Sequence, residues 1–415
     1  MLVLPNGPMW KHHRRIMGPA MTNRFLGKSA GQINQSIVEL VSLWESKTNL
    51  AMGKAFDANA DMENASMDAI CGLAFGTSWG CNRYAREQIE TSKAMTTGEL
   101  DDAVFKVDRP DLANAVYHVL QSLGYPNRPF PTLAHWFIRL TPAYRTHKSR
   151  LDNEFRRAIN ESRRLARKLG QEGLSPQDAE NTLDLMTGRG GSGKDELPEN
   201  EMADELFTYL LAGTETTSSA LSWWLKFMTN NPKMQIKLRE HVQQQAYGKR
   251  FGELGLDDLT PEKTPYLEAI IHETLRHGRV SVAYGRVAYL GLEESSNWKT
   301  GQGEDATRKV GYWQPGSARL FDPERWLEED GSFAANRGPS LPFGNGVRRC
   351  FGKNLALLEM RLFFAQLNMT YFFAPVGDVQ NSFEAVETVT RHPKKTLIRI
   401  IGWDSPEAQA ALARA

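Results

Sequence analysis

Cysteine is scarce in this chain of 415 residues, which contains only Cys71, Cys81 and Cys350. No two of them form a Cys-x-x-Cys pair, and none stands with histidine at the spacing of a zinc site. This pattern argues against a disulfide scaffold and against a structural zinc site. A sparse, odd set of cysteines suits a reducing compartment, where a single thiolate is available for metal binding or catalysis.

The sequence also has no long apolar run and no excess of charge. No stretch approaches the ~20 uninterrupted apolar residues that cross a bilayer, and the first residues are broken by proline too early for a signal peptide. Lys and Arg total 50 against 49 Asp and Glu, a net charge of +1. Without a basic surplus the chain is not expected to bind nucleic acid, and as given it is expected to be soluble.

Apolar residues recur every three or four positions through most of the chain. This period predicts a mainly α fold with a minor β sheet. The chain has no internal repeat and no clear linker, so a single domain over residues 1–415 is expected. The pattern predicts helices near 32–48, 61–74, 84–96, 110–123, 146–170, 199–229, 233–247, 261–277 and 353–367, and strands near 282–287 and 396–401.

Two polar, Gly-rich tracts interrupt this pattern. Residues 187–195 match the Gly-x-x-x-x-Gly-Lys of a phosphate-binding loop. However, Asp195 replaces the Ser or Thr that holds magnesium, and the preceding residues are predicted as a helix rather than a strand, so a flexible linker is favoured. Residues 291–311 have neither helical nor strand periodicity, and an irregular tract of this length indicates function, disorder or a wrong assignment.

A cysteine precedes a predicted helix in residues 341–353, Leu-Pro-Phe-Gly-Asn-Gly-Val-Arg-Arg-Cys-Phe-Gly-Lys, which we call the cysteine loop. The dipole of that helix and the charges of Arg348 and its neighbour are expected to favour the thiolate of Cys350, the form that binds metal. Gly346 and Gly352 allow the backbone to pass close to a flat ligand. Most lone cysteines are instead small buried hydrophobes, and the spacing of the loop decides between the two interpretations.

The positions of Phe343, Gly346, Arg348, Cys350 and Gly352 match every fixed residue of Phe-x-x-Gly-x-Arg-x-Cys-x-Gly. In this the chain resembles the cytochrome P-450 family, of which this is the heme-binding signature. The resemblance implies heme b (iron protoporphyrin IX) as cofactor and Cys350 as the axial ligand of the heme iron. It also implies that Arg348 pairs with a heme propionate and that Phe343 packs beside the sulfur. The other two cysteines match nothing in the signature.

A second motif interrupts the predicted helix 199–229, where the sequence reads Ala-Gly-Thr-Glu-Thr-Thr from Ala212. Glycine and β-branched residues are unfavourable inside a helix, although a Thr hydroxyl often bonds harmlessly to its own backbone. The six residues also match the Ala/Gly-Gly-x-Asp/Glu-Thr-Thr/Ser motif of the family. By that resemblance Thr216 stabilises activated oxygen, and Glu215 feeds protons through water as a general acid.

A charged pair and a downstream segment form a third match. Glu273-Thr-Leu-Arg276 places opposite charges on one helical face, and Phe-Asp-Pro-Glu-Arg-Trp ends at Trp326. Alone such a pair is usually surface decoration. The family resemblance implies that Glu273, Arg276 and Arg325 form a buried triad with a structural rather than a catalytic role.

Further arginines are candidate partners of the heme propionates. Trp10 and Arg14 match the Trp-x-x-x-Arg motif of the family, which in isolation is no more than a basic amphipathic turn. Arg286 stands at a predicted strand position where the family often has another propionate-binding arginine.

The resemblance implies a monooxygenase that inserts one oxygen atom from O2 into an apolar organic substrate. Electrons are expected from NADPH through a separate NADPH–cytochrome reductase, with cytochrome b5 as an additional donor, because the chain has no flavin or dinucleotide fingerprint. The style of the motifs is similar to microsomal enzymes of filamentous fungi, which suggests tailoring of a secondary metabolite. Two alternatives remain: an inactive or heme-binding-only remnant, and a heme-thiolate isomerase or dehydratase.

The chain reaches Trp10 almost at once, so we expect the N-terminal segment of the family to be absent. In eukaryotic relatives this segment holds a membrane anchor, the first strands and the first two helices. The resemblance therefore places the enzyme at the endoplasmic reticulum membrane, whereas a complete chain of this sequence is expected in the cytoplasm. A mis-spliced gene model or a decaying gene would explain both this start and the irregular tract 291–311.

Overall fold

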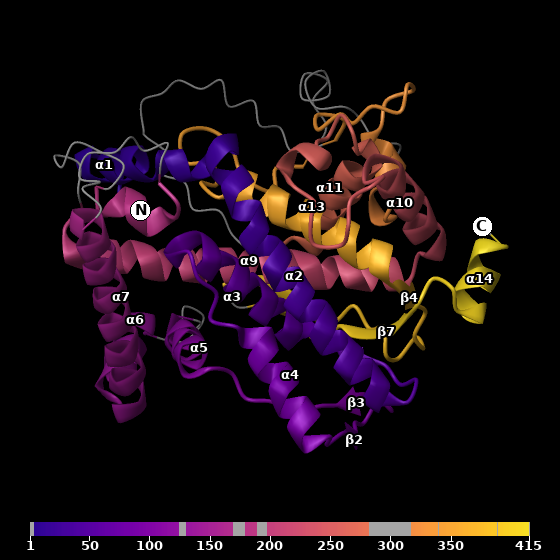
Figure 1. Cartoon of the computed structure of the whole chain (residues 1–415), viewed down its shortest axis with the longest axis horizontal. Coiled ribbons are helices and arrows are strands. Elements are labelled where there is room, and N and C mark those ends of the chain that lie inside the picture. The colour runs from indigo at the N-terminus through magenta and orange to yellow at the C-terminus, as the bar shows by residue number, and fades with distance from the viewer. Residues whose placement is uncertain are drawn as a thin grey trace.

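The computed structural model describes residues 4–123, 130–168, 179–188, 197–281, 317–338, 340–387 and 389–414. Helices dominate this part of the chain, and the strands gather at one side of them (Figure 1). The expected mainly α fold with a minor β sheet is confirmed. In the described residues, no helix is both long enough and apolar enough to cross a bilayer.

The helices of the described residues follow the apolar periodicity closely. Several of them begin at a proline, which is tolerated in the first turn because the amide hydrogen missing there has no intrahelical partner. The helices are α1 (Pro8–Met17), α2 (Asn23–Ala51), α3 (Asn59–Phe75), α4 (Cys81–Ser92), α5 (Asp111–Leu123), α6 (Pro131–Leu140), α7 (Pro142–Lys168), α8 (Thr182–Met186), α9 (Glu199–Thr229), α10 (Pro232–Gln245), α11 (Pro265–Gly278), α13 (Lys353–Thr370) and α14 (Pro406–Leu412).

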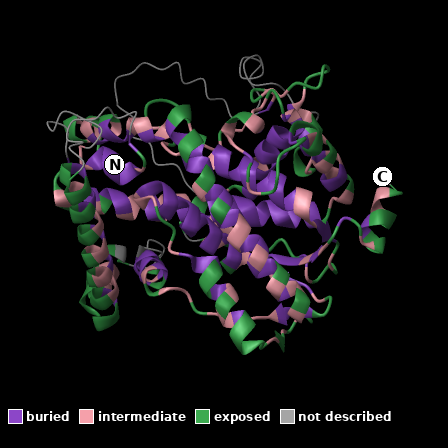
Figure 2. Ribbon diagram, viewed as in Figure 1, coloured by how far each residue is buried: buried purple, intermediate pink, exposed green. Residues whose placement is uncertain are grey.

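Helix α9 runs through the middle of the molecule, with α3, α11 and α13 packed around it (Figure 1). Its C-terminal half is buried on every side, which Figure 2 shows as an almost continuous buried stretch. Trp224 of α9 stacks on Phe364 of α13, with ring centroids 4.3 Å apart and planes at 9°. The same indole meets the edge of Phe373 at 5.4 Å. Stacked aromatic rings of this kind fix the distance between the two helices that carry the candidate motifs.

The strands form two small sheets. The larger has the order β2-β3-β1-β7-β4, in which β1 and β3 are parallel and the other neighbours antiparallel. The smaller is an antiparallel hairpin of β5 and β6, with Val386 opposite His392. The bounds are β1 (Phe56–Asp57), β2 (Thr96–Thr97), β3 (Ala103–Val104), β4 (Phe372–Ala374), β5 (Ala385–Glu387), β6 (Arg391–Pro393) and β7 (Leu397–Ile401).

Every predicted helix overlaps an observed one, and four of the nine lie wholly within α2, α3, α9 and α13. The predicted strand 396–401 is confirmed as β7. The predicted helix 84–96 is wrong at its end, because Lys93 adopts φ +48° and stops α4, and Thr96 belongs to β2. The predicted strand 282–287 and the irregular tract 291–311 lie outside the described residues.

Candidate functional site

The cysteine loop turns back on itself before α13 begins. The Cys350 amide donates to the Phe343 carbonyl at 2.8 Å, and the Arg349 amide donates to the Gly346 carbonyl at 3.1 Å. Gly346 has φ +76°, a conformation that side chains with a Cβ rarely adopt. The turn therefore needs glycine here, and it places Cys350 just before the N-terminus of the helix.

The Cys350 thiol opens to solvent on one side, while protein packed on its other sides desolvates it. This burial raises the pKa of Cys350 above its ordinary value, although the Gly352 amide and the charges of Arg14 and Lys353 act to lower it. The expectation that the surroundings of Cys350 alone favour the thiolate is therefore wrong. Because a bound metal ion deprotonates its thiol ligand, the ligand role does not depend on that expectation.

Helix α1 packs against the cysteine loop and supplies positive charge to it. The Arg14 guanidinium lies 4.7 Å from the ring centroid of Phe351, and the Arg348 guanidinium lies 4.9 Å from the ring of Trp10. Arg348 also donates to the Leu4 carbonyl at 2.9 Å. The Trp-x-x-x-Arg motif of α1 and the cysteine loop, which are far apart in the sequence, thus lie side by side. The resemblance implies this for residues that bind the same heme.

These residues fit a heme group in chemistry and in space. Burial lowers the pKa of Arg14, and the like charges of Arg349 and Arg348 lower it further, so the cluster favours an anionic partner such as a pair of propionates. A Cβ placed on Gly346 or Gly352 would meet no atom within 4 Å, so a flat group has room to approach the loop. The thiol of Cys350 would supply a soft ligand to the heme iron.

Helix α9 carries the second motif without a break in its helical hydrogen bonding. Thr216 is exposed, although Glu215 and Thr217 on either side of it are buried. Its hydroxyl donates to the Ala212 carbonyl at 2.7 Å, as the sequence allowed. A Cβ on Gly213 would lie 2.6 Å from a side-chain carbon of Ile70, so glycine lets α9 approach α3 closely at this point.

The carboxylate of Glu215 is held by β6 and the residue before it. Thr390 donates to Glu215 Oε2 at 3.2 Å, and His392 Nε2 lies 3.2 Å from the same oxygen. Thr390 and His392 are themselves 2.7 Å apart. The carboxylate of Glu63 lies near enough for its pKa, already raised by burial, to be raised further by Glu215. Sequence reasoning missed Thr390 and His392, since no motif marks the hairpin residues that fold back onto α9.

The side chains of Glu273, Arg276 and Arg325, the predicted triad, contact one another. Arg276 donates to both carboxylate oxygens of Glu273 at 2.7 and 2.8 Å, and Arg325 donates to Oε1 at 3.1 Å. Trp326 donates to Oε2 at 2.9 Å. Burial acts to raise the pKa of Glu273, but hydrogen bonds from Arg276, His277 and the Asp322 amide lower it to about 2. The surroundings therefore favour the ionised carboxylate, and both of its oxygens accept hydrogen bonds.

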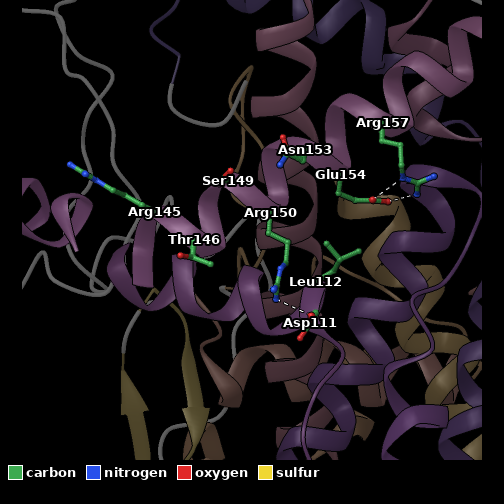
Figure 3. Close-up of a pocket in the computed structure, with 9 residues that line it drawn as sticks. All are labelled: Asp111, Leu112, Arg145, Thr146, Ser149, Arg150, Asn153, Glu154 and Arg157. Atoms are coloured by element: carbon green, nitrogen blue, oxygen red, sulfur yellow. Dashed lines mark hydrogen bonds and ion pairs between the residues drawn. The ribbon is translucent and has the colours of Figure 1, made fainter. Parts of the chain in front are cut away.

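One candidate residue is not described, and one surface hollow lies apart from the candidate residues. Arg286 lies outside the described residues. A surface hollow of ≈ 810 Å³ between α5 and α7 is lined by polar side chains that pair with one another, such as Arg150 with Asp111 at 3.0 Å (Figure 3). None of the candidate heme or oxygen residues lines this hollow.

Comparisons with known proteins agree with this assembly. The family model described as cytochrome P-450 matches residues 1–289 and 312–400. The chain is 26% identical to the cytochrome P-450 monooxygenase xilC of Penicillium rubens, over 96% of this chain and 76% of the relative. It is 25% identical to the cytochrome P-450 monooxygenase TRI13 of Fusarium sporotrichioides, over 94% and 77%.

Solved structures show the same fold. The heme domain of cytochrome P450DA superposes with a TM-score of 0.68 at 19% identity, and the match covers 97% of this chain and 79% of that one. The cytochrome P-450 CYP102L1 gives a TM-score of 0.68 at 21% identity, over 96% and 83%. With a family model that matches most of the chain, the protein is a member of the cytochrome P-450 monooxygenase family, and heme is its cofactor.

Proposed function

We propose that this chain inserts one atom of O2 into an apolar organic substrate, with Cys350 as the axial ligand of the heme iron. The observation that supports this best is that the cysteine loop packs against α1 and brings Cys350, Arg14 and Arg348 close together. When bound, heme supplies the redox chemistry that activates O2. Phe343, Gly346 and Gly352 shape the loop. The proposed partners of the propionates are Trp10, Arg14, Arg348 and Arg286.

We assign proton delivery to Glu215 and Thr216 of α9. Glu215 is held at one oxygen by Thr390 and His392, which leaves its other oxygen to exchange a proton with water. Thr216 stands one residue further on, with its hydroxyl exposed and bonded only to its own helix among the described contacts. A rotation of that hydroxyl would let it donate to a group on the open face of α9.

The electron donor is proposed to be a separate NADPH–cytochrome reductase, with cytochrome b5 as a further donor. Lys11, Arg15, Arg349 and Lys353 are exposed around the cysteine loop and give this face a positive charge. Such a face would attract an acidic redox protein. The fungal relatives support a role in tailoring a secondary metabolite, and residues 1–415 are proposed to work as one heme domain.

Association with the surface of the endoplasmic reticulum membrane is proposed because α6 exposes large apolar side chains to solvent. Large apolar side chains stand out from this helix and from the residue before it. Amphipathic segments rich in Trp, Phe and Leu bind at the boundary between lipid headgroups and acyl chains. The exposed residues are Phe130 (78%), Leu133 (56%), Trp136 (54%), Phe137 (58%) and Leu140 (43%).

The difference spectrum of the reduced chain under carbon monoxide tests the proposal. A long-wavelength thiolate-type Soret band is expected, and Cys350→Ala should abolish it while heme content measured by extraction falls. Incorporation of one atom from isotopically labelled O2, driven by NADPH and a reductase, then separates a monooxygenase from a heme-thiolate isomerase. A normal band without NADPH-dependent incorporation into any tested substrate would favour the isomerase or the heme-binding remnant.

A further inference from the structure

Helix α1 carries two proposed heme contacts but has little apolar surface of its own. Of its residues, only His13, Ile16 and Met17 are buried. The positions of Trp10 and Arg14 beside the cysteine loop must therefore be fixed by something other than extensive apolar packing. The third buried residue, a histidine, is the one with strong polar contacts to another helix.

The imidazole of His13 lies between two carboxylates of α9. Its Nδ1 is 2.7 Å from Oε1 of Glu205, and its Nε2 is 2.8 Å from Oε2 of Glu201. The side chains of His13 and Glu205 are 3% and 1% exposed, and that of Glu201 is 23% exposed. Residues four apart on a helix lie one above the other, so the two carboxylates contact the two ring nitrogens from adjacent turns of α9.

Both contacts are strong because of the chemistry of the groups involved. An ionised carboxylate can only accept a hydrogen bond, and an imidazolium donates from both ring nitrogens. The geometry therefore fits an imidazolium between two carboxylates, or a neutral imidazole with one carboxyl group protonated. In either state a charge-assisted bond crosses from α1 to α9, and of the three side chains only that of Glu201 is partly exposed to solvent.

Glu201 and Glu205 lie on a face of α9 that extends to the cysteine loop through Tyr209. Tyr209 lies one turn beyond Glu205 on α9, and its ring meets Phe351 edge-on with centroids 6.2 Å apart. Arg14, the residue after His13, packs on that same phenylalanine ring. Helix α1, helix α9 and the residue that follows Cys350 thus touch in one place.

We propose that His13 is a positioning residue that pins α1 to Glu201 and Glu205 of α9 and thereby sets Trp10 and Arg14 for heme retention. This inference rests on the proposed heme role of Cys350. Without this contact, α1 would lose its fixed place beside the loop, and a helix of ten residues that has lost tertiary contacts opens more often. The heme would then lose a defined pair of contacts while its axial ligand stayed intact.

The test measures two quantities in each variant: the rate of heme transfer from the holoprotein to excess apomyoglobin, and the hydrogen exchange of the α1 amides. His13→Phe keeps the ring volume and removes both N–H donors, and we expect heme loss about 10-fold faster, in the range found for residues that orient a metal ligand. Exchange in α1 should rise as well. His13→Gln restores one donor and should recover part of the retention.

Two matched controls separate positioning from general destabilisation. His12→Phe changes the neighbouring, less buried histidine of α1, and Leu238→Ala opens a cavity in α10 at the other end of the molecule (Figure 1). Both should leave the rate of heme loss near that of the unmodified chain, even where Leu238→Ala lowers the melting temperature as much as His13→Phe does. Equal heme loss and equal α1 exchange in His13→Phe and the unmodified chain would overturn the proposal. If the unmodified chain bound no heme, the proposed function would fail, and α1 exchange alone would decide on the pin.

Discussion

At the scale of single residues, Glu359 is a carboxyl group that the proposed chemistry does not use. It is buried in α13, where Thr217 of α9 donates to its Oε2 at 2.9 Å. Burial raises its pKa from 4.5 to about 8, and the hydrogen bond from Thr217 only partly opposes this. The group is therefore neutral in the folded protein at pH 7 and ionised in the unfolded chain.

This shift makes a prediction about stability. Between pH 4.5 and about 8 the unfolded chain binds fewer protons at Glu359 than the folded chain, so the free energy of unfolding falls as pH rises through that window. Glu359→Gln cannot ionise, and it should raise the free energy of unfolding by about 2–3 kcal/mol at pH 7. Urea unfolding at pH 5 and pH 7.5 checks this: the gain should be larger at the higher pH, and an equal gain at both would contradict the assignment.

The contact between His392 and Glu215 makes a second prediction at this scale. His392→Leu removes the imidazole that lies 3.2 Å from the carboxylate, so Glu215 should lose its fixed orientation. With a reductase present, NADPH consumption should slow by about 10-fold, less than the ~100-fold or more that loss of a general acid itself costs. Lys394→Ala, an exposed neighbour, is the control. An unchanged rate in His392→Leu would mean that Glu215 works without this partner.

At the scale of helices, α6 has the most exposed apolar face of the described chain relative to its length. The double variant Trp136→Glu/Phe137→Glu should weaken binding to vesicles of neutral and anionic phospholipid by at least about 10-fold, because two carboxylates replace the rings that enter the lipid boundary. Sedimentation with vesicles measures this. Val379→Glu/Val389→Glu changes exposed apolar residues elsewhere and should bind as the unmodified chain does. Equal binding of both double variants would exclude α6 as the contact.

Helices and motifs differ in how far the sequence predicts them. The long helices α2, α9 and α13 are predicted because apolar residues recur every three or four positions of the sequence over many turns. Helix α1 is not among the predicted helices, because it is only ten residues long and buries just His13, Ile16 and Met17. The end of α4 is misplaced because a left-handed Lys93, a conformation that lysine rarely adopts, stops it.

The candidate site divides in the same way. Cys350, Glu215 and Thr216 are found from local spacing, because each motif lies within one continuous segment. Glu201, Glu205 and His392 are not found, because they meet their partners across long separations in the chain that only the packing of α1, α9 and β6 defines. The thiolate expectation for Cys350 failed for a related reason, since burial depends on tertiary packing that local charges do not reveal.

At the scale of the whole molecule, helix α11 ties distant segments together through two buried carboxylates. Glu273 holds the segment of Arg325 and Trp326, and Glu268 accepts from Arg361 of α13 at 2.7 and 2.9 Å. Burial acts to raise the pKa of Glu268, but hydrogen bonds from His272 and Arg361 lower it to about 2. Both carboxylates thus stay ionised in the folded protein to far lower pH than in the unfolded chain.

These two groups predict how the protein unfolds in acid. Because their folded pKa values lie below the ordinary 4.5, the stability they contribute is present above pH 4.5 and is lost as pH falls towards about 2. Each contributes on the order of 3 kcal/mol over that range. The double variant Glu268→Gln/Arg361→Met removes one of them without leaving an unpaired buried charge, so its free energy of unfolding should fall less steeply between pH 5 and pH 2.5. Proton uptake on unfolding, measured by calorimetry in buffers of different ionisation enthalpy, should drop by about one proton near pH 3.5 in this variant. If the free energy of unfolding of the variant fell as steeply between pH 5 and pH 2.5 as that of the unmodified chain, Glu268 would not be a source of the acid sensitivity.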